Sequence, residues 1–218
     1  MKLIPAVLAV GALAGSAAAD GPPDCFKNTR PGCTDVGPYA VPKTPEELIA
    51  LRDTIAKDPW GGAAVTLLAF MAWQADEKLG EPLLVLAVSE KNVGKSKAAG
   101  SYNGYGLSGA LKSYLRMTER SKHCARSYAV GATPENRYAF DPSAVTLRML
   151  KPDPATPLDP TLTTYKVFVC TSGADSCRPI TLTSNKRGIW KADELSSVLV
   201  GCKAMAPAPG AEDPADAL

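Results

Sequence analysis

The sequence predicts a single α+β domain, in which three or four N-terminal helices pack on a C-terminal antiparallel sheet of four to five strands. Helical periodicity dominates the first half of the chain, and short runs of β-branched and aromatic residues dominate the second. Residues 63–73 contain one polar side chain, that of Thr66, so a helix there must be buried by the rest of the chain. Residues 184–188 predict a hairpin turn with Gly188 in the left-handed position. Helices followed by strands are typical of helices that cover one face of an antiparallel sheet.

The N-terminus is predicted to be a signal peptide. Residues 1–2 carry one positive charge, residues 3–15 are apolar, and the alanines at 17–19 supply the small side chains that a signal peptidase accepts. The apolar part is shorter than the roughly 20 residues needed to span a bilayer. Cleavage after Ala19 leaves 199 of the 218 residues, which is enough for one domain with a full core. We therefore expect an exported protein, periplasmic or secreted, without a membrane span.

The predicted domain spans residues 44–202, and three segments lie outside its regular structure. Residues 20–43 are rich in proline and glycine, which predicts an irregular lead-in stapled by a disulfide bond. Four prolines within residues 151–160 predict an exposed excursion. The Ala, Pro and Asp composition of residues 203–218 predicts a disordered tail.

The six cysteines support the prediction of export, because all of them follow the signal peptide and an even number favours disulfide bonds. The sequence leaves the connectivity open. Proximity along the chain favours three pairs, which are Cys25 with Cys33, Cys170 with Cys177 and, as the remaining pair, Cys124 with Cys202. In the chain-entropy model each short loop contributes about 2–3 kcal/mol and the long one about 4–5 kcal/mol. None of the spacings is C-x-x-C, which argues against a thioredoxin-like motif or a zinc ribbon.

The first helix has a clear start signal. Thr44 and Glu47 have the spacing of a capping box, with Pro45 at the first helical position. Leucine and isoleucine then recur at helical spacing, and we expect the helix to stop near Lys57, just before an Asp-Pro pair.

The most apolar helix is predicted to follow a turn at Gly61-Gly62. It should run over about residues 63–78, with Gly80 as its C-cap. Residues 82–89 are ambiguous, because the initial proline favours a helix whereas the leucines and valines permit a strand. The helix is the preferred interpretation.

Residues 91–106 predict a long loop. Leu107, Leu111 and Leu115 then recur at helical spacing and predict an amphipathic helix that ends at about Arg120. The alternation of polar and apolar residues in the second half predicts strands instead. The expected strands are residues 125–130, 144–150, 164–170, 179–183 and 189–192.

The third of these strands has the clearest period of two. Tyr165, Val167 and Val169 should lie on one face of the sheet. Pro179 has no backbone N–H to donate, so its strand should lie at an edge or begin there.

Several stretches of the chain are distinctive, namely TPEELIALRDTI, DPWGGAAV, SYAVGATPENRY and SGADSCRPITL with GIWK. In these stretches, over roughly residues 44–195, the chain resembles a domain-of-unknown-function family of secreted bacterial proteins. The resemblance implies an exported single domain and assigns no catalytic residues. The element order and the closing hairpin are also similar to the cone-shaped folds called NTF2-like or cystatin-like, a likeness that carries no function.

The sequence predicts no catalytic residues, no metal site and no cofactor. His123 is the single histidine, which excludes a site of several His ligands, and no hydrolase, P-loop or dinucleotide motif is present. His123 and Cys124 are adjacent, but neighbours in an extended segment point to opposite faces and Cys124 is expected to be oxidised. The acid pairs at residues 76–77 and 193–194 are adjacent in sequence, which is typical of solvated element ends.

Positive charge is concentrated in residues 91–126, where eight Lys and Arg side chains stand against Glu119 alone. Lys112, Arg116 and Arg120 are spaced by four and should line one face of the predicted helix. Their repulsion costs about 0.2–0.5 kcal/mol per neighbouring pair, and an anionic partner would relieve it. The alternative interpretation is a solvated outer face.

Two tyrosines precede this helix. Tyr102 and Tyr105, with Asn103 between them, offer rings and an amide on a predicted flexible loop, the residue types used for stacking on sugars or for adaptable polar contacts. The alternative is a tyrosine packed on the core.

The leading functional hypothesis is an exported, non-catalytic, envelope-associated domain that binds through this basic helix face and tyrosine loop. The predicted partner is an anionic envelope polymer or a protein. Removing Lys2 with the signal peptide lowers the formal net charge from +2 to +1, which argues for neither a nucleic-acid binder nor an enzyme with acidic substrates, and no nucleic acid is expected as a partner. Two alternatives stay open: a small exported enzyme with a pocket inside a cone-shaped α+β fold, and a structural envelope protein.

Overall fold

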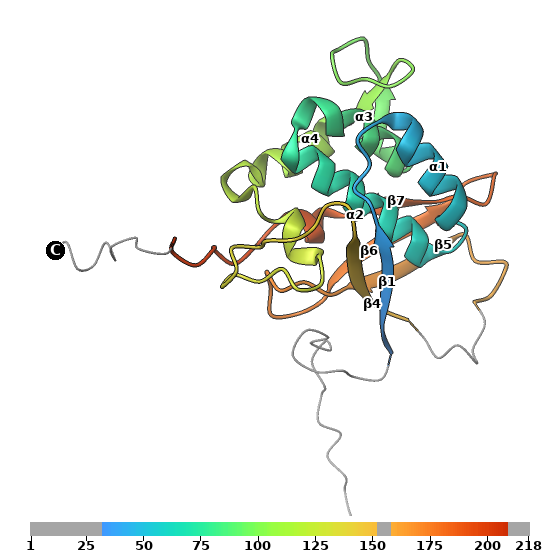
Figure 1. The fold of residues 1–218 in the computed structure, drawn as a ribbon. Coiled ribbons are helices and arrows are strands. Elements are labelled where there is room, and N and C mark those ends of the chain that lie inside the picture. Colours follow the sequence, from blue (N-terminus) through green and yellow to red (C-terminus); the bar gives the residue numbers. More distant parts are fainter. Residues whose placement is uncertain (1–31, 152–157, 209–218) are drawn as a thin grey trace, which may run out of the picture.

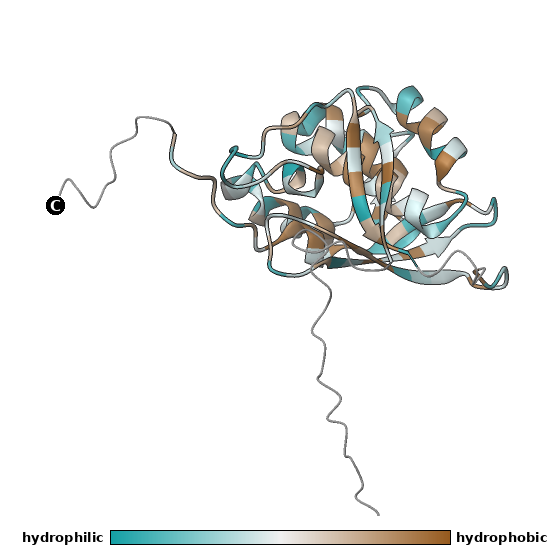
Figure 2. Cartoon of the chain, turned by 60° about the horizontal axis from the view of Figure 1, so that its bottom comes forward, coloured by the Kyte–Doolittle hydropathy of each residue, from teal (hydrophilic) through white to brown (hydrophobic). Residues whose placement is uncertain are grey.

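A computed structural model describes residues 32–151 and 158–208 and confirms the α+β class (Figure 1). The helices are α1 (Pro45–Ile55), α2 (Pro59–Ala75), α3 (Glu77–Ala87) and α4 (Gly109–Met117). The antiparallel sheet has the order β1-β4-β5-β6-β7, with the strands β1 (Cys33–Tyr39), β4 (Val145–Leu150), β5 (Thr164–Val169), β6 (Arg178–Ser184) and β7 (Trp190–Glu194). The helices lie on one side of this sheet, and the apolar residues gather between the two layers (Figure 2).

Strand β1 corrects the prediction that residues 20–43 form an irregular lead-in. It pairs antiparallel with β4, with Cys33 opposite Leu150. Gly37 has a φ of +123°, and a Cβ there would lie 2.6 Å from the carbonyl oxygen of Val145, so this close approach requires glycine. Local composition indicated a loop because the pairing partner lies more than a hundred residues further along the chain.

Helix α1 begins as its capping signal predicted. The hydroxyl of Thr44 accepts a hydrogen bond from the backbone N–H of Glu47 at 3.2 Å. The Glu47 carboxylate accepts from the backbone N–H of Lys43 at 2.7 Å, one residue before the partner that a capping box uses. The helix ends at Ile55, close to the predicted end at Lys57.

Helix α2 is the buried centre of the domain, and all its residues from Pro59 to Trp73 are buried. The predicted turn at Gly61-Gly62 is wrong. Asp58 caps the helix by accepting from the backbone N–H of Gly61 at 2.8 Å, so both glycines lie inside its first turn. A Cβ on Gly62 would lie 2.7 Å from the side chain of Leu182, so this glycine lets the helix pack directly on the sheet.

The predicted end of this helix is also wrong. It ends at Ala75, because the Asp76 carboxylate accepts from the first backbone N–H groups of α3 and starts a new helix. Gly80 lies inside α3 rather than at a C-cap, and a Cβ there would lie 2.1 Å from the Cα atom of Trp73. Helix α3 confirms the helical interpretation of residues 82–87, begins earlier, at Glu77, and ends at Ala87, two residues before the predicted end.

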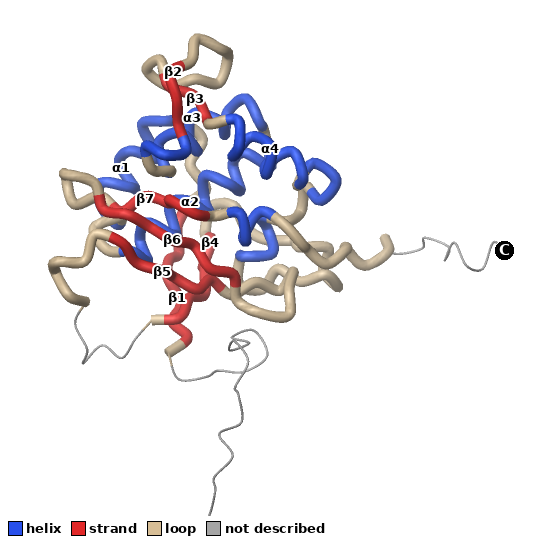
Figure 3. Tube along the Cα trace, turned by 180° about the vertical axis from the view of Figure 1, so that it is seen from behind, coloured by secondary structure: helices blue, strands red, loops and turns tan. Residues whose placement is uncertain are grey.

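Two further predictions fail between α3 and β4. The predicted long loop contains a small hairpin of β2 (Val93–Lys95) and β3 (Tyr105–Leu107), which stands beyond the helix layer in Figure 3. The strand predicted at residues 125–130 is instead the 3₁₀ helix η3 (Ala125–Tyr128). Three of its residues, Ala125, Ser127 and Tyr128, are buried, and the Tyr128 hydroxyl donates to the carbonyl oxygen of Val198 at 3.0 Å.

The remaining strands occur where they were predicted. Val167 and Val169 are buried on one face of β5, with Tyr165 partly buried on the same face. The β6–β7 turn has Gly188 at a φ of +70°. Pro179 lies at the start of β6, before the first residue of that strand that pairs with β7.

The chain ends are tied down where the structure describes them. The predicted Cys124–Cys202 disulfide is present. Beyond it the predicted disorder is wrong as far as residue 208, since the backbone N–H of Ala206 donates to the carbonyl oxygen of Pro134 at 2.9 Å. Residues 1–31, which include the predicted signal peptide, residues 152–157 and residues 209–218 lie outside the described residues.

The structure does not establish the other two predicted cysteine pairs. The Sγ atoms of Cys170 and Cys177 lie 3.0 Å apart in a buried position, so these residues are neighbours and a disulfide between them stays a prediction. Cys33 is disulfide-bonded. Its predicted partner Cys25 lies outside the described residues.

Candidate functional site

The three basic residues predicted to line one helix face do not share a helix. Lys112 lies on α4 and forms an ion pair with Glu81 of α3, with its Nζ atom 2.6 Å from the carboxylate. Arg116 is exposed in the last turn of α4. Helix α4 ends at Met117, and Arg120 lies in the following 3₁₀ helix η2 (Glu119–Ser121). One of these charges is therefore neutralised, and another belongs to a different element.

The predicted tyrosine loop is a tight turn. Tyr102 and Tyr105 exchange two backbone hydrogen bonds, at 2.8 and 2.9 Å, across Asn103 and Gly104. Both central residues have positive φ values, 48° and 79°, which is the geometry of a two-residue hairpin turn. Tyr102 packs partly on the core, whereas 47% of Tyr105 is exposed. The turn therefore presents Tyr105 from a defined backbone.

The two tyrosines face a groove rather than the basic face of α4. This groove has a volume of about 850 Å³ and lies between the C-terminal end of α3, the β2–β3 hairpin and the β6–β7 turn. We call it the hairpin groove. Its lining residues are Val85, Leu86, Val88, Ser89, Glu90, Val93, Tyr102, Asn103, Tyr105, Thr183, Ser184, Asn185, Lys186, Arg187 and Lys191. The structure thus unites the two predicted tyrosines with basic residues that lie far from them in the sequence.

The basic residues of the groove come from the β6–β7 hairpin. Lys186 and Arg187 are exposed in its turn, and Lys191 lies half-buried on β7, opposite Thr183. The carboxamide oxygen of Asn185 accepts from the backbone N–H groups of Arg187 and Ile189, at 2.9 and 3.1 Å, and fixes the shape of the turn. Three positive charges therefore line the groove against one negative charge, that of Glu90.

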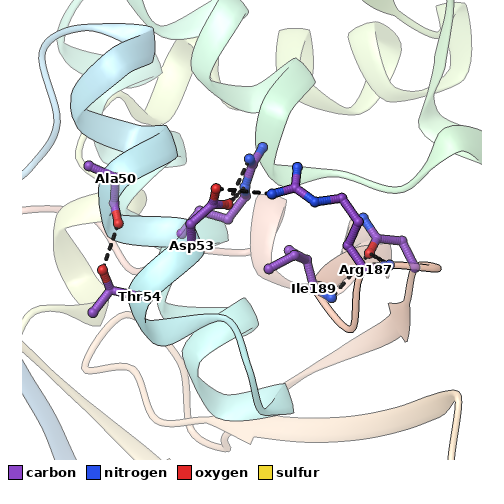
Figure 4. Close-up of polar contacts among 7 residues, drawn as sticks. Ala50, Asp53, Thr54, Arg187 and Ile189 are labelled. Atoms are coloured by element: carbon purple, nitrogen blue, oxygen red, sulfur yellow. Dashed lines mark hydrogen bonds and ion pairs between the residues drawn. The ribbon is translucent and has the colours of Figure 1, made fainter.

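Helix α1 ties this turn to the domain (Figure 4). The Arg187 guanidinium lies 3.3 Å from the Asp53 carboxylate. The same carboxylate accepts two hydrogen bonds from the buried Arg52, at 2.8 and 2.9 Å. The hydrogen bond from Arg52 is the main reason that the pKa of Asp53 lies below its ordinary value. One carboxylate thus serves two guanidinium groups.

Lys191 is the unusual charge of the groove. None of the ion pairs among residues 32–151 and 158–208 involves its amine. The pKa of Lys191 is lowered to about 8, chiefly by burial and also by the positive charges of Arg52 and Arg187. The amine of Lys191 is therefore partly desolvated and lies near like charges. A bound anion would stabilise its charged form.

The groove also has an apolar lining. It consists of Val85 and Leu86 from the end of α3, the following Val88, and Val93 from β2. Thr183 and Ser184 supply hydroxyl groups beside the cations. The groove can therefore hold a molecule that has both an apolar surface and an anionic group.

Other polar residues singled out in the sequence have structural roles. His123 stacks on Tyr138 with ring centroids 4.9 Å apart, and its Nε2 atom lies 2.9 Å from the carbonyl oxygen of Lys203. Cys124 is bonded to Cys202, which removes a thiol-imidazole pair. Asp193 accepts from the hydroxyl of Ser89 at 2.8 Å, at the junction of α3 and β7.

The part of the chain that the structure describes contains no cluster of three or more His, Cys, Asp and Glu side chains that could hold a metal ion. Among the same residues, no helix combines the length and apolarity needed to cross a membrane.

One family model matches residues 40–206, and its description is Domain of unknown function (DUF6935). No curated protein and no solved structure matches the chain. The matched region contains the whole hairpin groove as well as α4. It extends past both ends of the resemblance expected from the sequence and includes Cys202. The likeness to cone-shaped folds stays a prediction.

Proposed function

The protein belongs to the DUF6935 family, and from this premise we propose that it is an exported, non-catalytic domain that binds an anionic envelope ligand in the hairpin groove. The observation that carries the proposal is Lys191, a half-buried amine that lines the groove and has no ion-pair partner among the described residues. This moves the binding surface from the basic helix face expected from the sequence to the β6–β7 hairpin.

Electrostatics support an anion at this position. The groove lining carries two more positive than negative charges, from Lys186, Arg187 and Lys191 against Glu90. A concave site with low-dielectric walls focuses the field of its charges more strongly than a convex helix surface does. Partial burial strengthens the attraction, because an anion replaces the water that the amine of Lys191 has lost.

Two features favour binding over catalysis. The space between the helices and the sheet is filled by apolar side chains of α2, so the groove lies at the edge of the domain rather than inside a cone. Glu90 is the single carboxylate in the groove lining, whereas hydrolysis of a glycosidic bond generally uses two acids that flank the bond.

Export is proposed from the sequence of residues 1–19, which has the charge and hydropathy pattern of a signal peptide. The Cys124–Cys202 disulfide is compatible with an oxidising compartment. A domain that meets envelope polymers would require such a location.

The proposal can be tested with two matched double variants. Lys186→Ala with Lys191→Ala removes two charges from the groove, and Lys112→Ala with Arg116→Ala removes two from α4. We expect the groove variant to bind immobilised polygalacturonate or polyphosphate at least about tenfold more weakly, because charge-assisted hydrogen bonds are lost. The α4 variant should elute at nearly the salt concentration of the unaltered protein.

Thermal unfolding of each variant provides the control for folding. Unchanged retention of a folded groove variant on both columns, or an equal loss in the α4 variant, would reject the groove as the binding site.

A further inference from the structure

The hairpin groove is larger, and its lining residues are more varied, than a site for a small anion requires. Its volume of about 850 Å³ falls within the roughly 300–1,000 Å³ typical of sites for organic ligands. A lone inorganic anion would occupy a small part of this space and would leave the exposed ring of Tyr105 without a contact. The size and lining of the groove therefore favour an anionic group that belongs to a larger molecule.

Tyr105 is suited to a flat, semi-polar ring. It is 47% exposed and lines the groove from the tight turn that Asn103 and Gly104 form. Two backbone hydrogen bonds hold this turn, so the backbone that carries the Tyr105 ring is ordered before a ligand binds. The protein therefore loses little conformational entropy at this turn on binding. The C–H groups on one face of a sugar ring can pack on such an aromatic surface, as apolar surface packs on any aromatic side chain.

Neutral polar residues also line the groove. Ser184 and Asn185 lie on the β6–β7 side of the groove, and Asn103 lies on the side of the tyrosines. Hydroxyl and amide groups both donate and accept hydrogen bonds, which matches the hydroxyl groups of a saccharide. An acyl chain offers no partner for these groups, and burying them unpaired would cost free energy.

We infer that the hairpin groove recognises a carboxylated saccharide, with a sugar ring on Tyr105 and its carboxylate at Lys191 and Arg187. This inference rests on the proposed function and names the ligand class of the same site. A polyphosphate chain or a nucleic acid would contact the cations and would not need Tyr105. Binding of such a polyanion is therefore the competing outcome of the test.

The experiment measures affinity by isothermal titration calorimetry with three probes: short oligogalacturonates, their methyl esters and polyphosphate. The esters keep the sugar rings and remove the charge. The variants are Tyr105→Ala, Tyr105→Phe, Lys191→Ala and Tyr114→Ala. Tyr114 is the matched control, because it is 43% exposed on α4 and does not line the groove.

Oligogalacturonates should bind the unaltered protein more tightly than either other probe. Tyr105→Ala should weaken this binding by about three- to tenfold, since an aromatic contact is lost, whereas Tyr105→Phe and Tyr114→Ala should leave it unchanged. Lys191→Ala should remove the preference for the free acid over the ester.

The outcomes separate the two proposals. Polyphosphate that binds as tightly as oligogalacturonates, esters that bind equally well, or an unaffected Tyr105→Ala variant would overturn the saccharide inference, while loss of polyphosphate binding in Lys191→Ala would still support an anion site. No effect of Lys191→Ala on any probe would overturn both.

Discussion

The hairpin groove and the outer face of α4 are both basic, but their charges differ in what surrounds them. On α4, Lys112 is paired with Glu81 and Arg116 extends into solvent. In the groove, Lys191 is half-buried and stands beside Arg187 without a carboxylate of its own. The density of charge along the sequence is higher around α4, yet the energetic demand for an anion is higher in the groove. Burial and pairing, rather than the number of charges, decide where an anion is favoured.

Removing the carboxylate from the ion pairs at the two surfaces should give the largest difference in the free energy of unfolding. Asp53→Ala leaves the buried Arg52 without its carboxylate beside Arg187 and Lys191, and we expect a loss of about 2–3 kcal/mol in the free energy of unfolding. Glu81→Ala removes the partner of Lys112, a more exposed cation, and should cost about 1 kcal/mol or less. Urea unfolding at neutral pH measures both values.

The order of the two losses is the informative result. A Glu81→Ala variant that loses as much stability as Asp53→Ala would show that the charges on α4 are held as tightly as those behind the groove.

Much of this domain was predictable because its signals are local. The cap at Thr44, the buried run at residues 63–73 and the hairpin turn at Gly188 each depend on residues a few positions apart. Strand β1 was missed because its partner β4 is distant in sequence, and a Gly-Pro pair resembles a loop until that pairing is known. The glycines in α2 and α3 are typical of helix ends when the sequence is considered alone, and only the fold shows the close contacts that require them.

The site was predictable only in part, for the same reason. The sequence identified Tyr102 and Tyr105 as candidate binding residues, and both line the groove. It assigned them to the basic helix that follows, because nearness along the chain was the available criterion. Lys186 and Lys191 belong to a hairpin some 80 residues away, where they resembled ordinary turn and strand residues. A lysine on a strand edge gives no sequence signal of its burial.

Replacing Lys191 should also change the free energy of unfolding, in a way that replacing a lysine on α4 should not. Its pKa is about 8 in the folded protein against an ordinary value of 10.5, so the unfolded chain binds more protons between these values and stability rises with pH across that window. Below about pH 8 the charged amine is a net cost. We therefore expect Lys191→Met to raise the free energy of unfolding at pH 7 by about 1–3 kcal/mol while it weakens ligand binding.

The pH profile separates this effect from better packing alone. The advantage of Lys191→Met should shrink as pH rises from about 8 to 10.5 and vanish above that range, where the amine of the unaltered protein is neutral in the folded and the unfolded state alike. Lys112→Met is the control and should be neutral or slightly destabilising, since it gives up an ion pair. A constant advantage at every pH would show that the charge of Lys191 is not the source of the gain.

The smallest expected effect is a charge reversal on α4. Arg116→Glu should change the free energy of unfolding by about 0.5 kcal/mol, because the side chain is exposed and loses only a favourable position near the C-terminus of a short helix. Lys186→Glu changes the charge by the same amount on an exposed residue of the β6–β7 turn, so the two variants differ mainly in location. On immobilised polygalacturonate, Arg116→Glu should shift the eluting salt concentration slightly and Lys186→Glu should shift it strongly. Equal shifts would mean that the polymer responds to the overall charge of the protein. A larger shift from Arg116→Glu would place the binding surface on α4, because a ligand bound in the groove interacts with that helix only through screened, long-range attraction.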